Sequence, residues 1–180
     1  MRHALLLPFL GAMTACQNIP ATFPLPAQRA AVEDGRLYAA TRILEMGDPA
    51  IAAFLVRGIG RDIEGGAWRW TGQRPTVRLR PRTNYGVYYA IEFTLPEATF
   101  KDTGPVTISY FVGDHLLDRV LYARAGGWHF DKLVPEDWIT PQRDVELAAE
   151  VDKVWTSKID GAKLGFVLNA MGLTQTPPPR

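Results

Sequence analysis

The sequence predicts an all-β protein: an antiparallel two-sheet β-sandwich of jelly-roll type, with about nine or ten strands. From residue 37 onward, short apolar runs are separated by Gly, Pro, Asn and Asp at spacings of about ten residues, a pattern typical of sandwiches and barrels. Within several of these runs apolar and polar residues alternate, as expected of strands that bury one face in an antiparallel sheet. No segment shows a convincing helical period.

The expected strands follow one another along most of the chain. Residues 42–46 and 51–57 are the first two apolar runs; the alternative is a helix over residues 35–57, which Pro49 and the neighbouring glycines disfavour. The last run, residues 164–173, is almost entirely apolar and indicates a central strand covered on both sides. The other expected strands are residues 67–71, 76–80, 87–95, 106–112, 116–123, 128–134 and 145–151.

The stretch from Glu64 to Thr71 carries two tryptophans two positions apart, with an arginine between them. Residues i and i+2 share one face of a strand, so Trp68 and Trp70 lie on one face and Arg69 on the other. Two indoles on one face are either a block of hydrophobic core or a platform for a ligand. Because the neighbouring strands alternate cleanly, we expect the indoles to pack between the sheets and Arg69 to face outward. A turn is expected directly afterwards, at residues 72–75.

The N-terminal segment has the organisation of a signal peptide. A short basic start precedes an apolar run at residues 4–13, which is too short to span a bilayer but suits a signal-peptide core. The run leads into Met13-Thr14-Ala15-Cys16, which contains the only cysteine of the chain. This ending resembles the lipobox of bacterial lipoproteins, although leucine is usual where Met13 stands. The resemblance implies that residues 1–15 are cleaved, that Cys16 is lipidated on sulfur, and that the lipid anchors the protein to a membrane.

The remaining segments complete the expected domain organisation. Residues 16–36 contain three prolines, which favour extended backbone and indicate a tether behind the lipidated cysteine. Gln17, rather than aspartate, follows the cysteine; by resemblance to the sorting pattern of Gram-negative lipoproteins, this favours the outer membrane. The β-sandwich domain is expected at residues 37–173 and a disordered tail at residues 174–180.

Two motifs frame the expected domain. The first is Glu-Gly-Gly-x-Trp-Arg-Trp-Thr at residues 64–71, followed by a charged alternating strand, and the second is Asp-Gly-Ala-Lys-Leu-Gly-Phe at residues 160–166. In this order they resemble β-sandwich domains of the galactose-binding or carbohydrate-binding-module kind, which accompany bacterial glycosyltransferases and envelope proteins. Related modules often end in Asp-x-Arg-x-Leu-Gly, whereas Ala162 stands at the arginine position here. Saccharide binding is what this resemblance implies.

Two tryptophans in expected loops are the candidate ligand contacts. Sugars present apolar C–H faces that stack on indole rings, and ligand sites tend to lie at the ends of sandwiches. Trp138 lies in an expected loop at residues 135–141, and Trp155 begins a polar turn region at residues 155–161. The alternative is that these indoles build core.

A run of arginines between residues 57 and 82 is a second candidate, because only two acids oppose it. Arg69, Arg78 and Arg80 could bind an acidic polysaccharide or phosphorylated lipid headgroups, since guanidinium pairs bidentately with such anions. The alternative is a solvated strand face whose arginines pair with acids in residues 131–152 on a neighbouring strand.

The sequence gives little indication of catalysis. Neither serine lies in a Gly-x-Ser-x-Gly turn, and Cys16 is the only thiol, so we expect no Ser or Cys triad. Scattered acids could supply the two carboxyls of a glycoside hydrolase, but acids on alternating strands usually face solvent. His115 and His129 lack zinc-ligand spacing, so we expect no metal and no cofactor. The net charge of +1 gives no global attraction to nucleic acid.

These observations lead us to expect a non-enzymatic, lipid-anchored protein of the cell envelope whose sandwich binds a saccharide or surface glycan. The second hypothesis is a structural or assembly lipoprotein that binds an envelope protein partner, and a third is a small envelope hydrolase. The positions of Trp138 and Trp155 distinguish the first hypothesis from the second, because tryptophans exposed beside polar groups in a concave site favour saccharide binding.

Overall fold

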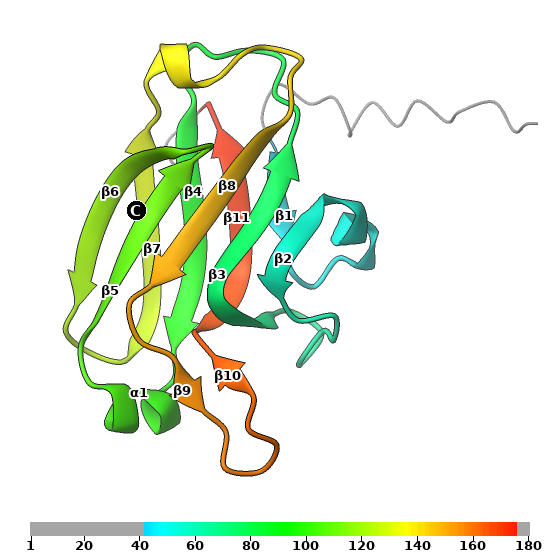
Figure 1. The fold of residues 1–180 in the computed structure, drawn as a ribbon. Helices are drawn as coiled ribbons and strands as arrows, with labels where there is room; N and C mark the ends of the chain where they lie inside the picture. Colours follow the sequence, from blue (N-terminus) through cyan, green and yellow to red (C-terminus); the bar gives the residue numbers. More distant parts are fainter. Residues whose placement is uncertain (1–41, 176–180) are drawn as a thin grey trace, which may run out of the picture. The chain divides into compact units, whose positions relative to one another are not determined.

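The computed structural model describes residues 42–175, which form a mostly β domain (Figure 1). Cys16 and the expected signal peptide and tether lie outside the described residues. The main strands are β1 Arg42–Glu45, β2 Leu55–Ile59, β3 Arg69–Leu79, β4 Tyr88–Leu95, β5 Val106–Val112, β6 His115–Tyr122, β7 Gly126–Leu133, β8 Val145–Val151 and β11 Val167–Thr174. In this part of the chain they make one antiparallel sheet of nine strands in the order β6-β5-β8-β3-β11-β4-β7, with β1 beside β11 and β2 beside β3. The prediction of an antiparallel β fold is confirmed at this level: the domain is mostly β.

Strand β3 joins the two halves of this sheet. Its first residues pair with β11, at Arg69↔Leu168 and Trp70↔Val167, and its last four residues pair with β8. Residues 72–75, where we expected a turn, belong to β3, which curves instead of ending (Figure 1). That prediction of a turn is therefore wrong, because Gly72 and Pro75 bend the strand without breaking it. The sheet is nearly closed into a barrel-like form and is not clearly divided into two sheets.

The prediction that the Arg69 side chain faces outward is also wrong. Arg69 is only 3% exposed, whereas Trp68 and Trp70 are half-buried and meet edge to face, with ring centroids 5.8 Å apart. The reason is the continuity of β3: residues an even number apart share a face, so Arg69 lies on the same inner face as Val77 and Leu79. A turn at residues 72–75 would have separated two strands, so the sequence-based interpretation did not link the facing of Arg69 to that of Val77 and Leu79.

Buried Arg69 ties three segments of chain together. Its Nε donates to the carbonyl of Met46, 2.9 Å away, and its Nη1 donates to the carbonyls of Gly60 and Arg61. Met46 directly follows β1, and the other two residues directly follow β2. Among residues 42–175 no carboxylate forms an ion pair with Arg69, so backbone carbonyls supply its hydrogen-bond acceptors. This guanidinium is a structural element of the domain.

The sheet does not close between β6 and β7, which are consecutive in the chain but do not pair. Side chains bridge this β6–β7 seam. Lys132 Nζ lies 2.8 Å from Asp118 Oδ2, and the rings of Tyr122 and Trp128 meet with centroids 4.9 Å apart. The hydrogen bond from Lys132 lowers the pKa of the Asp118 carboxyl. The seam is thus held by side chains, and its strand edges lack mutual backbone pairing.

Three tyrosines stand in the core. Tyr89 donates its hydroxyl to the carbonyl of Ala148, 3.2 Å away, and the hydroxyls of Tyr110 and Tyr122 lie 2.6 Å apart. The ring of Phe130 stacks on Tyr110 with centroids 3.8 Å apart. Burial raises the pKa of all three hydroxyls above the ordinary tyrosine value.

We expect the free energy of unfolding to fall as the pH rises above about 10, where tyrosines of the unfolded chain ionise. The folded pKa values are raised, so the stabilisation is present in full below the unfolded pKa. It is lost as the pH climbs from there through the folded pKa, by up to about 1.4 kcal/mol per pH unit for each of Tyr89 and Tyr110. Urea unfolding across this range measures the slope, which Tyr89→Phe should flatten. A free energy that stays constant to about pH 11 would contradict the expectation.

Short helices occur at places where the sequence indicated none. The 3-10 helix η2, Pro49–Phe54, occupies part of the run expected to be a strand; Asp48 caps it by accepting a hydrogen bond from the Ala50 amide at 2.8 Å. The α-helix α1, Glu97–Thr103, begins after a proline and ends at Gly104, whose φ of 66° suits a glycine. A long helix over residues 42–57 does not form, as the sequence indicated.

Candidate functional site

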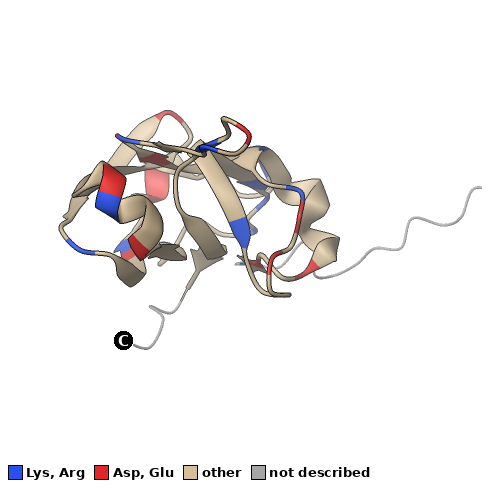
Figure 2. Ribbon diagram, turned by 90° about the horizontal axis from the view of Figure 1, so that it is seen from below, with Lys and Arg blue, Asp and Glu red and all other residues tan. Residues whose placement is uncertain are grey.

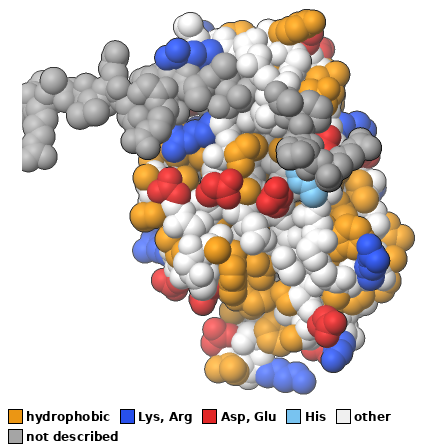
Figure 3. Space-filling model, turned by 180° about the vertical axis from the view of Figure 1, so that it is seen from behind, with side chains coloured by type: hydrophobic (Ala, Val, Ile, Leu, Met, Phe, Trp, Pro, Cys, Tyr) orange, Lys and Arg blue, Asp and Glu red, His pale blue; other side chains and the backbone are white. Residues whose placement is uncertain are grey.

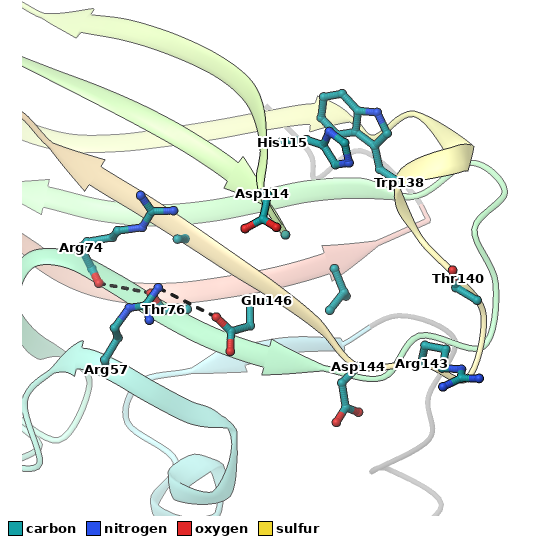
Figure 4. A pocket seen from close by; sticks show the side chains of 13 residues that line it. Arg57, Arg74, Thr76, Asp114, His115, Trp138, Thr140, Arg143, Asp144 and Glu146 are labelled. Atoms are coloured by element: carbon teal, nitrogen blue, oxygen red, sulfur yellow. Dashed lines mark hydrogen bonds and ion pairs between the residues drawn. The ribbon is translucent and has the colours of Figure 1, made fainter.

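A cleft of about 380 Å³ lies over β2, β3 and β8 and extends to the loop between β7 and β8 (Figure 4). Its walls come from β2, β3, the turn between β5 and β6, the start of β8, and the loop that contains the 3-10 helix η3, Glu136–Trp138. The polar side chains of the lining are Arg57, Arg74, Thr76, Asp114, His115, Thr140, Arg143, Asp144 and Glu146, and the indole is that of Trp138. The cleft therefore combines hydrogen-bonding groups of both signs with a flat ring.

The ring wall of the cleft consists of a stacked pair. The imidazole of His115 lies on the indole of Trp138, with centroids 4.6 Å apart and planes 17° apart. Trp138 is half-buried and packs against the hydrophobic core, so the exposed ring of the pair is His115. A tight turn at Gly113, with φ of 58°, brings His115 to this position. The sequence led us to Trp138, whereas His115 was considered only as a zinc ligand.

Trp155 does not belong to this cleft. It lies in β9, Trp155–Thr156, which pairs with β10, Lys163–Leu164, as a separate two-stranded ribbon. Its Nε1 donates to Asp102 Oδ2 in α1, 2.7 Å away. Figure 1 shows β9 and α1 at the opposite end of the sheet from the loop between β7 and β8, which contains Trp138. The two candidate tryptophans are therefore not brought together.

Two arginines of β3 and the arginine just after it pair with acids in β8 or with Asp144 just before β8. Arg78 lies directly opposite Glu146 in the β3–β8 register. Their hydrogen bond raises the pKa of Arg78, and a hydrogen bond from Arg80 lowers the pKa of Asp144. The three pairs and their N–O distances are Arg74–Glu150 at 2.6 Å, Arg78–Glu146 at 2.8 Å and Arg80–Asp144 at 2.7 Å. This geometry agrees with the alternative interpretation of a paired strand face.

Charges are mixed over the rest of the domain. In Figure 2, Lys and Arg are interspersed with Asp and Glu along the ribbon, and neither sign dominates the view. Within residues 42–175 no group of His, Cys, Asp and Glu side chains is arranged to hold a metal ion. The same residues contain no helix with the length and apolar character needed to cross a bilayer.

A smaller hollow of about 170 Å³ lies on the outer face of β1, β11, β4 and β7. The strand register places Glu45, Ala170, Glu92 and His129 in one row across these strands. Figure 3 shows acidic side chains gathered beside a histidine on this side of the domain. Burial, and next the charge of Glu92, raise the pKa of Glu45. Two acids beside a histidine on a strand face do not by themselves identify a ligand, so this hollow supports no functional assignment.

Comparison with known proteins yields no relative: no protein-family model matches the chain, and no curated protein matches it. The likeness to lipoproteins and carbohydrate-binding modules therefore stays a prediction from the sequence. The cleft is the feature of the described residues from which a function can be inferred.

Proposed function

We propose that the protein is a non-catalytic, lipid-anchored component of the bacterial cell envelope whose β domain binds a saccharide. The cleft of about 380 Å³ supports this proposal, because it places a stacked ring pair beside hydroxyl, carboxylate and guanidinium groups. Sugars offer apolar C–H faces and many hydroxyls, so a saccharide site needs a ring together with several hydrogen-bond donors and acceptors. Anchoring through Cys16 and location at the outer membrane are parts of the same proposal.

The jelly-roll arrangement expected from the sequence also belongs to this proposal. In that description β3 divides the sheet into two layers, one with β8, β5 and β6 and the other with β11, β4 and β7. The ligand would then bind at one end of the sandwich, where the β5–β6 turn and the η3 loop meet.

The surroundings of the carboxyls in the cleft favour binding over hydrolysis. A general acid of a glycosidase needs a raised pKa. Asp144 has a lowered pKa because Arg80 donates to it, and Glu146 is held by Arg78 at 2.8 Å. Arginines therefore already bind two of the three carboxyls in the cleft, and only Asp114 is left without such a partner among the described residues.

Titration of the full-length protein in detergent against a panel of glycans tests the proposal, with tryptophan fluorescence as the signal. We expect at least one glycan to bind, and His115→Ala to weaken its affinity about tenfold, which corresponds to about 1.4 kcal/mol. His129→Ala, on the outer face of β7, is the matched control and should leave the affinity unchanged. Absence of any response at millimolar concentrations, or equal binding by the His115 variant, would refute the proposal.

A second candidate function is binding of an envelope protein partner. Leu121 on β6 and Leu133 on β7 are 63% and 51% exposed, and these strands are the two ends of the sheet order. Strand edges with free backbone groups and exposed leucines are features of protein interfaces. If no glycan binds, the β6–β7 seam becomes the surface to test by chemical cross-linking.

A further inference from the structure

We infer that the saccharide bound in the cleft is acidic, and that Arg57 and Arg143 are the residues that bind its anionic groups. This inference rests on the proposed function and names the class of its ligand. It differs from the expectation based on the sequence, because Arg69 is buried and Arg78 and Arg80 are already paired.

Among the described residues, the pairing of charges around the cleft leaves one arginine without a carboxylate partner and another with only a long, shared ion pair. Arg74, Arg78 and Arg80 pair with three acids, as described above. Arg57 approaches only Glu146, at 3.9 Å, which is longer than a hydrogen bond, and the nearer partner of Glu146 is Arg78. Within residues 42–175 no carboxylate pairs with Arg143.

One carboxylate in the lining of the cleft also lacks an ion-pair partner among the described residues. Within the described part of the chain no cation pairs with Asp114, which stands beside His115 in the turn after β5. Arg143, which has no carboxylate partner among these residues, and Arg57, which shares Glu146 with the nearer Arg78, therefore face one unpaired carboxylate. The surplus is positive, and it favours an anionic ligand over a cationic one.

The backbone holds both arginines in place. Arg57 lies on β2 directly opposite Thr76 of β3. Arg143 closes a turn in which its amide donates to the carbonyl of Thr140 at 3.1 Å, while the preceding amide, that of Gln142, donates to Pro81 at 2.7 Å. With the backbone at both positions already fixed, only the two side chains have to become ordered when a carboxylate, sulfate or phosphate binds.

The spacing of the two arginines indicates more than one anionic group in the ligand. Figure 4 shows Arg57 and Arg143 at opposite ends of the cleft, with Glu146 and Asp144 between them and the His115–Trp138 pair along one side. A sugar ring can lie against that pair while Asp114 accepts hydrogen bonds from its hydroxyls. Acidic groups on flanking sugars then reach the two guanidinium groups, as in an oligomer of acidic sugars.

The test compares three oligosaccharides of equal length with the full-length protein in detergent: a uronic-acid oligomer, its methyl ester, and a sulfated oligomer. We expect at least one acidic oligomer to bind about tenfold more tightly than the neutral ester, and added salt to reduce this difference. Arg57→Gln and Arg143→Gln should each reduce the preference, and the double variant should bind acidic and neutral oligomers equally. The two acidic probes show whether carboxylate or sulfate is the preferred anion.

Arg61→Gln is the matched control: Arg61 is exposed and outside the cleft lining, and within residues 42–175 its side chain forms no hydrogen bond. It should keep the preference for the acidic oligomer. Equal binding of acidic and neutral oligomers by the wild type overturns this inference and leaves the proposed function standing. Failure of all three to bind, together with the rest of the glycan panel, overturns the proposed function itself. An acidic preference that survives in the double variant places the anion elsewhere and also overturns the inference.

Discussion

Replacing Arg69 with methionine is expected to lower the free energy of unfolding by about 3–5 kcal/mol. Methionine keeps much of the volume of the side chain but removes the donors to three carbonyls that follow β1 and β2. Buried carbonyls without a donor cost free energy, and hydrogen bonds from a charged group are stronger than neutral ones. Urea denaturation followed by far-ultraviolet circular dichroism measures the loss.

The control for this variant is Arg78→Met on the same strand. Arg78 faces solvent, and its hydrogen bond to Glu146 joins two exposed side chains, so this change should leave the stability almost unaltered. Arg69→Lys should be intermediate, because one ammonium group cannot reproduce the planar fork that reaches three carbonyls. If Arg69→Met unfolds like the wild type, the guanidinium does not hold these segments together.

Replacing Gly172 with alanine is the second change expected to have a large effect, with a loss of about 3 kcal/mol or more. A β-carbon at this position would overlap the carbonyl oxygen of Arg42 and lie 2.8 Å from the α-carbon of Ile43, both in the backbone of β1. Backbone in a paired strand cannot rotate aside as a flexible side chain can, so β1 must separate from β11. Hydrogen exchange of the β1 amides should accelerate more than that of β8.

Gly127→Ala provides the comparison for this prediction. Gly127 lies in β7, and a β-carbon built there meets no atom within 4 Å. Its substitution should be neutral or slightly stabilising, because alanine restricts the unfolded chain more than glycine does. If the two substitutions changed the free energy of unfolding equally, the close approach of β1 to β11 would not be the cause of the loss in Gly172→Ala.

Much of the strand structure could be predicted from alternation alone. The expected strand at residues 145–151 coincides with β8, and the expected strands at 106–112 and 87–95 match β5 and nearly match β4. Alternation is a local property, since residues two positions apart share a face whatever their partners. The short helices η2 and α1 were missed because six or seven residues are too few to show a helical period.

The prediction for Arg69 failed although the sequence contained a pattern that would have placed this side chain inward. Val77 and Leu79 were correctly placed inward, and the parity of one unbroken strand would have placed Arg69 inward with them. Gly72 and Pro75 indicated a turn because both are common in turns. Whether such residues end a strand or bend it depends on the partner strands, here β11 and β8, which lie about 70 to 100 residues away along the chain.

The sequence by itself determined the antiparallel β class, most strands, the loop position of Trp138, and the availability of acids to pair with the arginines of β3. Only the tertiary structure decided which arginine is buried, which are closely paired with acids, and which line the cleft with a long ion pair or none among the described residues. It also joined His115 to Trp138 and separated both from Trp155. The physical reason is that local patterns arise from neighbours in the chain, whereas burial, ion pairing and cavities depend on register between distant strands.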